Sequence, residues 1–293
     1  MITGNTNIYD GIWGWNRDPE ILRARMLIEN AQCVLVRLGS GFDLACGIDF
    51  HKADMRFLDY FGDFHRNYGI SSISQGITFP YVTDETHWAF ASRLAMMLHY
   101  DSEPARPVRL LHNILHGKDS YVITSSIAGQ LQEAGFDHLR MFETHGNVMG
   151  MQCVEGCHDT VYDVEELVRK MSEEQDDCFV PEELVPHCPN CGAGMRLHIE
   201  GPHYVGGMEE KARHREFVHF LDRAREGGLV ELRLGVNELE YDSKAAILMS
   251  EVPEKDASVI SVGEDVSLDP PVRCDVYVPV RSNIVVALHQ LLP

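Results

Sequence analysis

The sequence predicts an α/β fold, in which a mostly parallel β-sheet carries helices on both faces. Short apolar runs rich in β-branched residues alternate along the chain with helical patterns, as in βαβ units. The first of these runs, 33–41 (CVLVRLGSG), ends in glycines. An apolar run that stops at glycines indicates a buried strand that enters a tight loop before a helix.

The elements follow from the N-terminus in the order helix, strand, insertion. Residues 20–31 read as an amphipathic helix with Pro19 near its first turn. Residues 51–104 are rich in aromatic side chains, and we expect an irregular, partly helical insertion without a clear strand, its aromatic rings forming core. Beyond it we expect helices at 108–116, 127–135 and 208–226, a buried strand at 120–124, and strand or core segments at 229–236, 245–250 and 258–263.

Composition limits the functions open to the chain. Of its 293 residues, 44% are hydrophobic and 24% charged, which is enough apolar material for a sizeable core and excludes a disordered protein. The formal net charge of −20 argues against nucleic-acid and anionic-lipid partners. The sequence shows no apolar run of membrane-spanning length and no basic, then apolar, N-terminal signal. We therefore expect a cytoplasmic protein that binds neither nucleic acid nor membranes.

Two close pairs of cysteines give the strongest local signal. Cys153 and Cys157 form the first pair, and Cys188 and Cys191, in the sequence CPNCG, form the second. Four thiolates brought together are the ligand set of a structural, tetrahedral Zn²⁺ site. The alternative is a set of free buried cysteines or a redox pair. His158, His187 and Cys178 lie nearby and are possible substitute ligands.

A glycine loop follows the first predicted strand, in the sequence GSGFDLACGI over 39–48. Such a loop brings backbone close to a phosphate at the start of a helix. Gly39 and Gly41 could equally serve only a tight strand-to-helix turn. A second polar loop, TSSIAGQLQEAG, follows the strand at 120–124, and a His145-Gly146 pair precedes the cysteines.

In these three motifs the chain resembles the sirtuin family. The family pattern GAGxSxxxGI aligns with 39–48, the pattern TQNIDGLHxxAG with 124–135, and the His-Gly pair with His145 and Gly146. The resemblance covers roughly 20–265. It implies a Rossmann-like parallel sheet with an inserted zinc-binding module and a helical or irregular insertion. The implied divisions are a discontinuous NAD-binding domain (1–50, 105–150 and 200–293), an insertion (51–104) and a zinc module (151–199).

Within the family, three stretches of the sequence are most similar to the bacterial macrodomain-linked class of sirtuins. The stretch 47–50 lacks the family's PDFR sequence, and the aromatic stretch 79–93 and the QCxxxCHxxxYD stretch 152–163 are similar to that class. Its members are thought to transfer ADP-ribose from NAD to a protein, a lipoylated carrier, rather than to act as efficient deacylases. The resemblance therefore implies an NAD-dependent transferase, or a deacylase, with a protein acceptor.

The resemblance also implies site residues. His145 matches the general base of common sirtuins, and Ser126 would contact ribose or water. The residues implied to bind NAD are Gly39, Ser40, Gly41, Asp43, Ser126, Gly235, Asn237 and Gly263. Several family positions differ, since the TQN asparagine is Ser126 and the IDG aspartate is Ala128. The alternative is a catalytically degenerate module that binds NAD, ADP-ribose or a partner protein.

Overall fold

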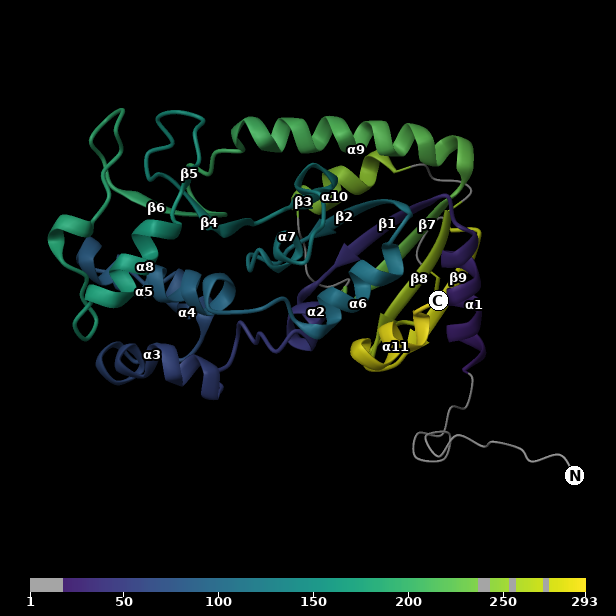
Figure 1. Ribbon diagram of the computed structural model, residues 1–293, viewed down its shortest axis with the longest axis horizontal. Coiled ribbons are helices and arrows are strands. Elements are labelled where there is room, and N and C mark those ends of the chain that lie inside the picture. Colours follow the sequence, from purple (N-terminus) through teal and green to yellow (C-terminus); the bar gives the residue numbers. More distant parts are fainter. Residues whose placement is uncertain (1–17, 237–242, 253–256, 271–273) are drawn as a thin grey trace, which may run out of the picture.

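The computed structural model describes residues 18–236, 243–252, 257–270 and 274–293 (Figure 1). Its centre is a six-stranded sheet in which every neighbouring pair is parallel. In spatial order the strands are β3 (Met141–Glu143), β2 (Asp119–Thr124), β1 (Cys33–Leu38), β7 (Leu229–Leu234), β8 (Ala257–Gly263) and β9 (Val276–Arg281). Since most residues of β1, β2 and β7 are buried, these strands suit the centre of a sheet covered on both faces.

Helices cover both faces of this sheet. Side chains of β1 alternate between them, so Val34 packs toward α1 (Pro19–Asn30), α6 (Arg106–Leu115) and α11 (Ile284–Leu291). Leu35 faces the opposite core, with α9 (Gly207–Gly227) and α10 (Ser243–Glu251). Figure 1 shows α9 running along the whole sheet and on toward the second part of the molecule. This arrangement confirms the predicted α/β fold class.

A second, smaller sheet packs with the aromatic insertion. Its strands are, in spatial order, β5 (Tyr162–Asp163), β4 (Gly146–Cys153) and β6 (Met195–Ile199), all antiparallel. The insertion forms α3 (Met55–Tyr68), α4 (Ile73–Ile77), α5 (Asp84–Ala95) and a π-helix at Met96–Tyr100, and α8 (Glu165–Glu174) packs against α5. As predicted, 51–104 contains no strand, and this stretch is described throughout.

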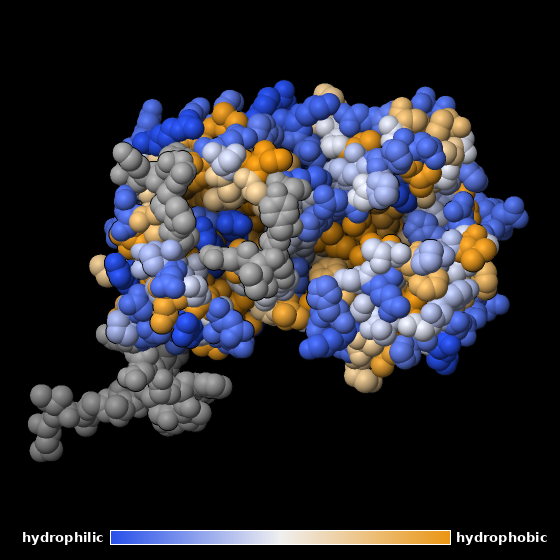
Figure 2. Space-filling model, turned by 180° about the vertical axis from the view of Figure 1, so that it is seen from behind, coloured by the Kyte–Doolittle hydropathy of each residue, from blue (hydrophilic) through white to orange (hydrophobic). Residues whose placement is uncertain are grey.

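One hydrophobic core joins the insertion to the cysteine-bearing segment. Phe61 and Phe90 stack with ring centroids 4.4 Å apart, and both are buried. The indole of Trp88 donates a hydrogen bond to the backbone oxygen of Met195 in β6, at 3.2 Å. The aromatic rings therefore form core, as expected, and residues 51–104 and 151–199 share it. Figure 2 shows a hollow between the two parts of the molecule, with apolar side chains inside it.

Three details differ from the sequence prediction. The segment 245–250, expected as strand or core, forms no strand but contributes Ala245 and Leu248 to the core from the helix α10, in which these two residues are three positions apart and share a face. The helix expected over 127–135 is shortened to α7 (Gln130–Glu133), since Gly129 adopts a left-handed conformation at φ +65°. The sequence did not predict β9 or α11. Among the described residues no helix combines the length and apolarity that crossing a membrane needs.

Candidate active site

The glycine loop packs backbone to backbone against the end of β7. The N–H of Gly39 donates to the oxygen of Leu234 at 3.1 Å, and the N–H of Gly41 to that of Gly235 at 3.0 Å. A methyl group on Gly39 would lie 2.5 Å from the Gly235 oxygen, and one on Gly41 would lie 2.8 Å from Gly235 Cα. These glycines are therefore required by close packing, and their N–H groups are engaged within the protein.

This contact lies at the switch point of the sheet. From β1 the chain proceeds to β2 and β3 on one side, whereas β7, β8 and β9 extend on the other. Crevices at the carboxyl ends of the strands form at such points, and ligands of open α/β sheets bind in them. The loop between β1 and α2 (Ser40–Ala45) and the loop after β7 both lie at this edge.

Two cavities open along the same edge and meet at Ser40, Leu44 and Val236. The first, which we call the His145 cavity, has a volume of about 760 Å³ and extends to His145 and Glu200. The second, the Gly263 cavity, has a volume of about 740 Å³. Both volumes fall in the range of small-molecule sites, and together they form a trough across the sheet edge.

The trough gathers most of the residues predicted to bind a dinucleotide. Gly39, Ser40 and Asp43 line the His145 cavity. Ser40 also lines the Gly263 cavity, together with Gly41, Gly235 and Gly263. Asn237 lies outside the described residues. Ser126 lines neither cavity and lies instead in a small pocket next to the trough.

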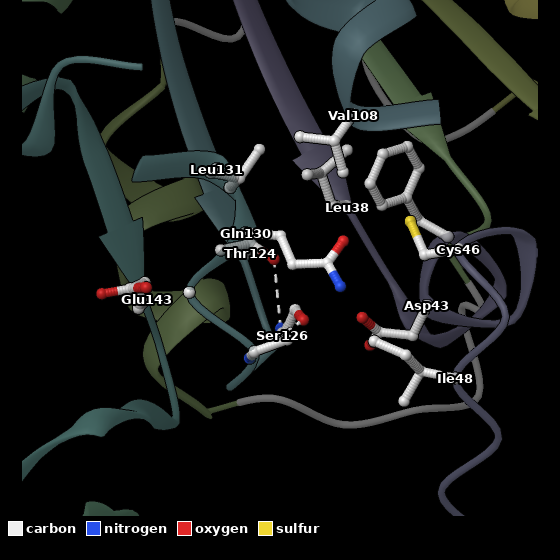
Figure 3. A pocket seen from close by; sticks show the side chains of 13 residues that line it. Leu38, Asp43, Cys46, Ile48, Val108, Thr124, Ser126, Gln130, Leu131 and Glu143 are labelled. Carbon is white, nitrogen blue, oxygen red and sulfur yellow. Dashed lines mark hydrogen bonds between the residues drawn. The ribbon is translucent and has the colours of Figure 1, made fainter. Parts of the chain in front are cut away.

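The small pocket brings Ser126 together with Asp43 and Gln130 (Figure 3). The Ser126 hydroxyl accepts a hydrogen bond from the N–H of Ala128 at 3.4 Å, so this serine both lines the pocket and supports the turn before α7. Asp43 is buried, and in Figure 3 the amide of Gln130 points toward it. Burial, together with the Asp43 carboxylate, raises the pKa of the neighbouring Cys46 to about 12, so Cys46 remains a neutral thiol.

Sequence reasoning did not single out Gln130. It occupies a position that is apolar in the motif to which the loop was compared, and it is 7% exposed. Its side-chain oxygen accepts a hydrogen bond from the N–H of Ala105 at 3.1 Å. The sequence feature that could have identified Gln130 is its place within the apolar stretch IAGQL, because a glutamine buried there needs hydrogen-bond partners for its amide.

His145 lines the first cavity and lies in the chain between β3 and β4. Its Nδ1 is 3.2 Å from the backbone oxygen of Ser125, and its Nε2 is 3.2 Å from Oε2 of Glu200. Both side chains are partly exposed, 35% for His145 and 42% for Glu200. Glu200 was not predicted, because it approaches His145 only through the pairing of β4 with β6, strands that are distant in sequence.

The four cysteines predicted to bind zinc form one cluster. Their sulfur atoms all lie within 4.8 Å of one another, and the pairs Cys153–Cys191 and Cys157–Cys188 are 3.6 Å apart. A tetrahedral ion with Zn–S bonds of about 2.3 Å requires sulfur atoms about 3.8 Å apart. The cluster therefore fits a structural zinc ion.

The other residues near these cysteines are not part of the cluster. The Nδ1 atom of His158 lies 3.0 Å from the Cys157 sulfur, and its Nε2 lies 2.8 Å from the Tyr162 hydroxyl oxygen. Cys178 is buried beside Asp63 and Asp177, next to the guanidinium of Arg93. None of the eight cysteines, all of which are described, forms a disulfide.

The chain is similar in sequence to proteins whose names include ADP-ribosyltransferase. The chain is 27% identical over 223 residues to a protein ADP-ribosyltransferase of Staphylococcus aureus, an alignment that covers 75% of this chain and 69% of that protein. It is 24% identical over 202 residues to a probable bifunctional ADP-ribose hydrolase/ADP-ribosyltransferase of Fusarium oxysporum, covering 64% of this chain and 34% of that protein. The chain thus spans about a third of this second relative. No protein-family model matches the chain.

Solved structures share its fold. A Sir2 homologue in complex with NAD superposes with a TM-score of 0.63 at 14% identity, covering 92% of each chain. A mutant Sir2 homologue in complex with ADP-ribose gives a TM-score of 0.60 at 15% identity, covering 92% of this chain and 94% of the other. These structures show that the chain has the sirtuin fold.

Proposed function

We propose that this chain, which has the sirtuin fold, is an NAD-dependent protein ADP-ribosyltransferase with His145 as its general base. The observation that carries the proposal is the trough at the switch point of the sheet, whose first cavity is lined by His145. The named ADP-ribosyltransferase activity of the bacterial relative favours transfer over deacylation. The complexes of the structural neighbours support NAD as the bound dinucleotide.

The residues of the trough fit a dinucleotide whose adenosine half lies in the Gly263 cavity and whose nicotinamide half lies in the His145 cavity. Ser261, Gly263 and Asn283 would surround its adenosine half in the Gly263 cavity. The contact of Gly41 with Gly235 leaves no side chain there, so the backbone can approach a pyrophosphate closely, although the N–H groups of Gly39 and Gly41 are not donors to it. Ser40, which lines both cavities, would lie beside the pyrophosphate.

The nicotinamide end would extend toward His145. NAD, when bound, supplies an ADP-ribosyl group through the breaking of its nicotinamide–ribose bond. The hydrogen bond to the Ser125 carbonyl requires a proton on Nδ1 of His145, because a carbonyl oxygen only accepts. In the neutral imidazole Nε2 is then the acceptor, and His145 lines the cavity. There His145 would take the proton that the acceptor side chain loses as its bond to the ribose forms.

Ser126 and Asp43 would act from the adjoining pocket. The Ser126 hydroxyl accepts the Ala128 N–H and retains its own O–H as a donor toward ribose or water. Asp43 lines both this pocket and the His145 cavity, and we propose that it contacts the ribose side of the dinucleotide rather than its phosphates, which it would repel. Asn237, outside the described residues, remains a proposed NAD contact.

The zinc ion would be structural. Cys153 and Cys188 belong to the core that the second sheet shares with the aromatic insertion, and β4, which ends at Cys153, begins next to His145. A metal bound by the four thiolates would hold the ends of β4 and β6 together. It would thereby stabilise the wall of the trough without touching the reacting atoms.

The acceptor is proposed to be a protein, more specifically a lipoylated carrier protein. The first part follows the name of the bacterial relative. The second rests on the sequence resemblance to the macrodomain-linked class. We also propose a cytoplasmic location, because cysteines that are available to bind zinc instead of forming disulfides are typical of a reducing compartment.

A transfer assay tests the function. The zinc-loaded protein is incubated with NAD labelled in its adenylate phosphate, a carrier protein with or without its lipoyl group, and, separately, an acetyl-lysine peptide. Label on the lipoylated carrier together with released nicotinamide would support the proposal. Deacylation of the peptide without protein labelling would replace it with a deacylase. NAD binding without nicotinamide release in any mixture would favour the catalytically degenerate module.

A further inference from the structure

We infer that Glu200 is a positioning residue for His145 and the group through which its proton reaches water. The inference rests on the proposed function, because it assigns Glu200 to the same reaction. Glu200 Oε2 lies 3.2 Å from His145 Nε2, and both residues line the His145 cavity. Glu200 therefore approaches the ring nitrogen that the proposed function assigns to proton transfer.

The second sheet fixes this pair through its backbone. Glu200 follows β6 directly, and its N–H donates to the oxygen of His145 at 2.9 Å, beside the register pair Gly146–Ile199 of β4 and β6. Gly146 makes the approach possible, since it has φ +70° and a methyl group on it would lie 2.1 Å from the His198 oxygen. The glycine of the His-Gly pair thus lets the strand that carries Glu200 come close to His145.

The hydrogen-bond partners of His145 determine how its protons are shared. The Ser125 oxygen accepts from Nδ1, so that nitrogen keeps its proton. An ionised Glu200 is also only an acceptor, so the contact at Nε2 forms when a proton lies between Nε2 and Oε2. The contact therefore becomes a hydrogen bond once Nε2 has taken up a proton, and loss of this proton returns Nε2 to a base with the ring still oriented by Ser125.

The proton moves through the pair in three steps. The acceptor side chain gives its proton to Nε2 of His145 as its bond to the ribose forms, while the nicotinamide–ribose bond of NAD breaks and neutral nicotinamide leaves. The imidazolium passes this proton to Oε2 of Glu200, which returns the neutral ring. Glu200, whose side chain is 42% exposed, releases the proton to water. The carboxylate is thus also the ion partner of the imidazolium before the proton leaves.

Other charged residues face the same cavity, and they define the alternative roles that the test must exclude. They are Arg37, Asp43, Asp49, His51 and Lys52. If Glu200 bound a ribose hydroxyl directly instead of acting through His145, its loss would weaken NAD binding. If it served only to stabilise the sheet, its loss would lower stability and leave the state of His145 unchanged.

The first test uses the NAD-free, zinc-loaded protein and requires no activity. In ¹⁵N NMR of the histidine rings at about pH 5.5, where an ordinary imidazole is mostly protonated and an ordinary carboxyl mostly ionised, the change Glu200→Gln should shift the His145 Nε2 signal, because the charged acceptor of its N–H is lost, and leave the Nδ1 signal in the protonated range. The matched control is Glu103→Gln, an exposed glutamate outside the trough. The signal is assigned with His145→Gln. An unchanged Nε2 signal in Glu200→Gln would overturn the inference even if the enzyme is active.

The second test measures the reaction. Glu200→Gln should lower kcat roughly tenfold to hundredfold, less than the 10²–10⁴-fold contribution of a general base itself, while KM for NAD stays within about twofold. Added formate should restore part of the activity of Glu200→Ala, because it supplies a carboxylate at the same place. A raised KM with kcat unchanged would show that Glu200 binds NAD directly and would refute the inference. If wild type releases no nicotinamide, the proposed function fails, and the NMR result still decides whether the pair exists.

Discussion

Gly41 donates its N–H to the backbone oxygen of Gly235 at 3.0 Å, and this contact joins the loop after β1 to the end of β7. It lies where the strand order of the sheet reverses, and both glycines line the Gly263 cavity of the trough. The glycines that resemble a phosphate-binding motif therefore also join two loops of the sheet edge through close backbone packing. Their replacement should disturb stability and ligand binding together.

The change Gly235→Ala should be strongly destabilising. The added methyl group would lie 2.4 Å from the Gly41 carbonyl carbon, and φ is +60° at this position. Overpacking costs about 1–3 kcal/mol, and the left-handed conformation adds about 1–2 kcal/mol. Urea unfolding should show the sum as a lower midpoint. Gly117→Ala is the matched control. Its φ is +75° and no atom lies within 4 Å of the added methyl group, so this change should lose only the free energy of the left-handed backbone conformation. Equal losses in the two variants would refute the packing argument.

Removal of one zinc ligand should destabilise the second sheet. Cys188→Ser replaces a buried thiolate of the cluster, and we expect bound zinc, measured by elemental analysis, to fall from one ion per chain toward none. The free energy of unfolding should drop on the order of 3 kcal/mol or more, roughly 6–12 °C in Tm. Cys274→Ser, outside the cluster, should keep its zinc. Full zinc occupancy in Cys188→Ser would contradict a four-cysteine site.

Introducing at position 128 the aspartate of the sirtuin motif should cost stability. Ala128 is 1% exposed and belongs to the core of the second sheet. A carboxylate there loses its hydration, and an uncompensated buried polar group costs about 1–3 kcal/mol or more. Ser126→Asn, at a partly exposed position, should change stability by less than about 1 kcal/mol. Thermal unfolding of the two single variants measures the difference. A stable Ala128→Asp protein would show that the pocket already accommodates the charge.

Asp119 should make stability depend on acid pH. Burial pushes the pKa of this carboxyl up, but hydrogen bonds from Arg223 and Arg140 outweigh burial and hold it below its usual value. A lowered pKa stabilises the folded state above the unfolded pKa of about 3.9, and this contribution is lost as the pH falls through the folded pKa.

Comparison with Asp119→Asn tests this dependence. The variant should lose about 1–2 kcal/mol at neutral pH, and the difference should shrink below about pH 4. Denaturant unfolding across the acid range gives both values. Asp222→Asn, which removes an exposed pair with Arg225, should change stability by less than about 0.5 kcal/mol at any pH. A difference for Asp119→Asn that persisted unchanged at low pH would exclude the ionised pair as its cause.

The central strands were predictable because burial on both faces favours short, largely apolar runs, as in 33–38, 120–124 and 229–234. β9 was missed because Pro279 interrupts its pattern. Proline is tolerated there because β9 is an edge strand. The segment 245–250 was ambiguous because a short apolar run fits either a strand or a buried helix.

The site was predictable where its residues are close in sequence. The spacing of the two cysteine pairs predicted the cluster that the structure forms. The contact of Glu200 with His145 depends on the register of β4 and β6, and that of Gly41 with Gly235 on the order of strands in the sheet. Neither relationship has a local sequence pattern, because the tertiary fold creates both.

The most direct test is calorimetric titration of the zinc-loaded protein with NAD, for wild type and His145→Ala, followed by an assay of free nicotinamide after a lipoylated carrier protein is added as the acceptor. Both proteins should bind NAD with similar affinity, and wild type should release nicotinamide once the acceptor is present. The variant should release it at least about 10²-fold more slowly. Absence of NAD binding by wild type up to millimolar ligand, or equal nicotinamide release by both proteins in the presence of the acceptor, would contradict the proposed function.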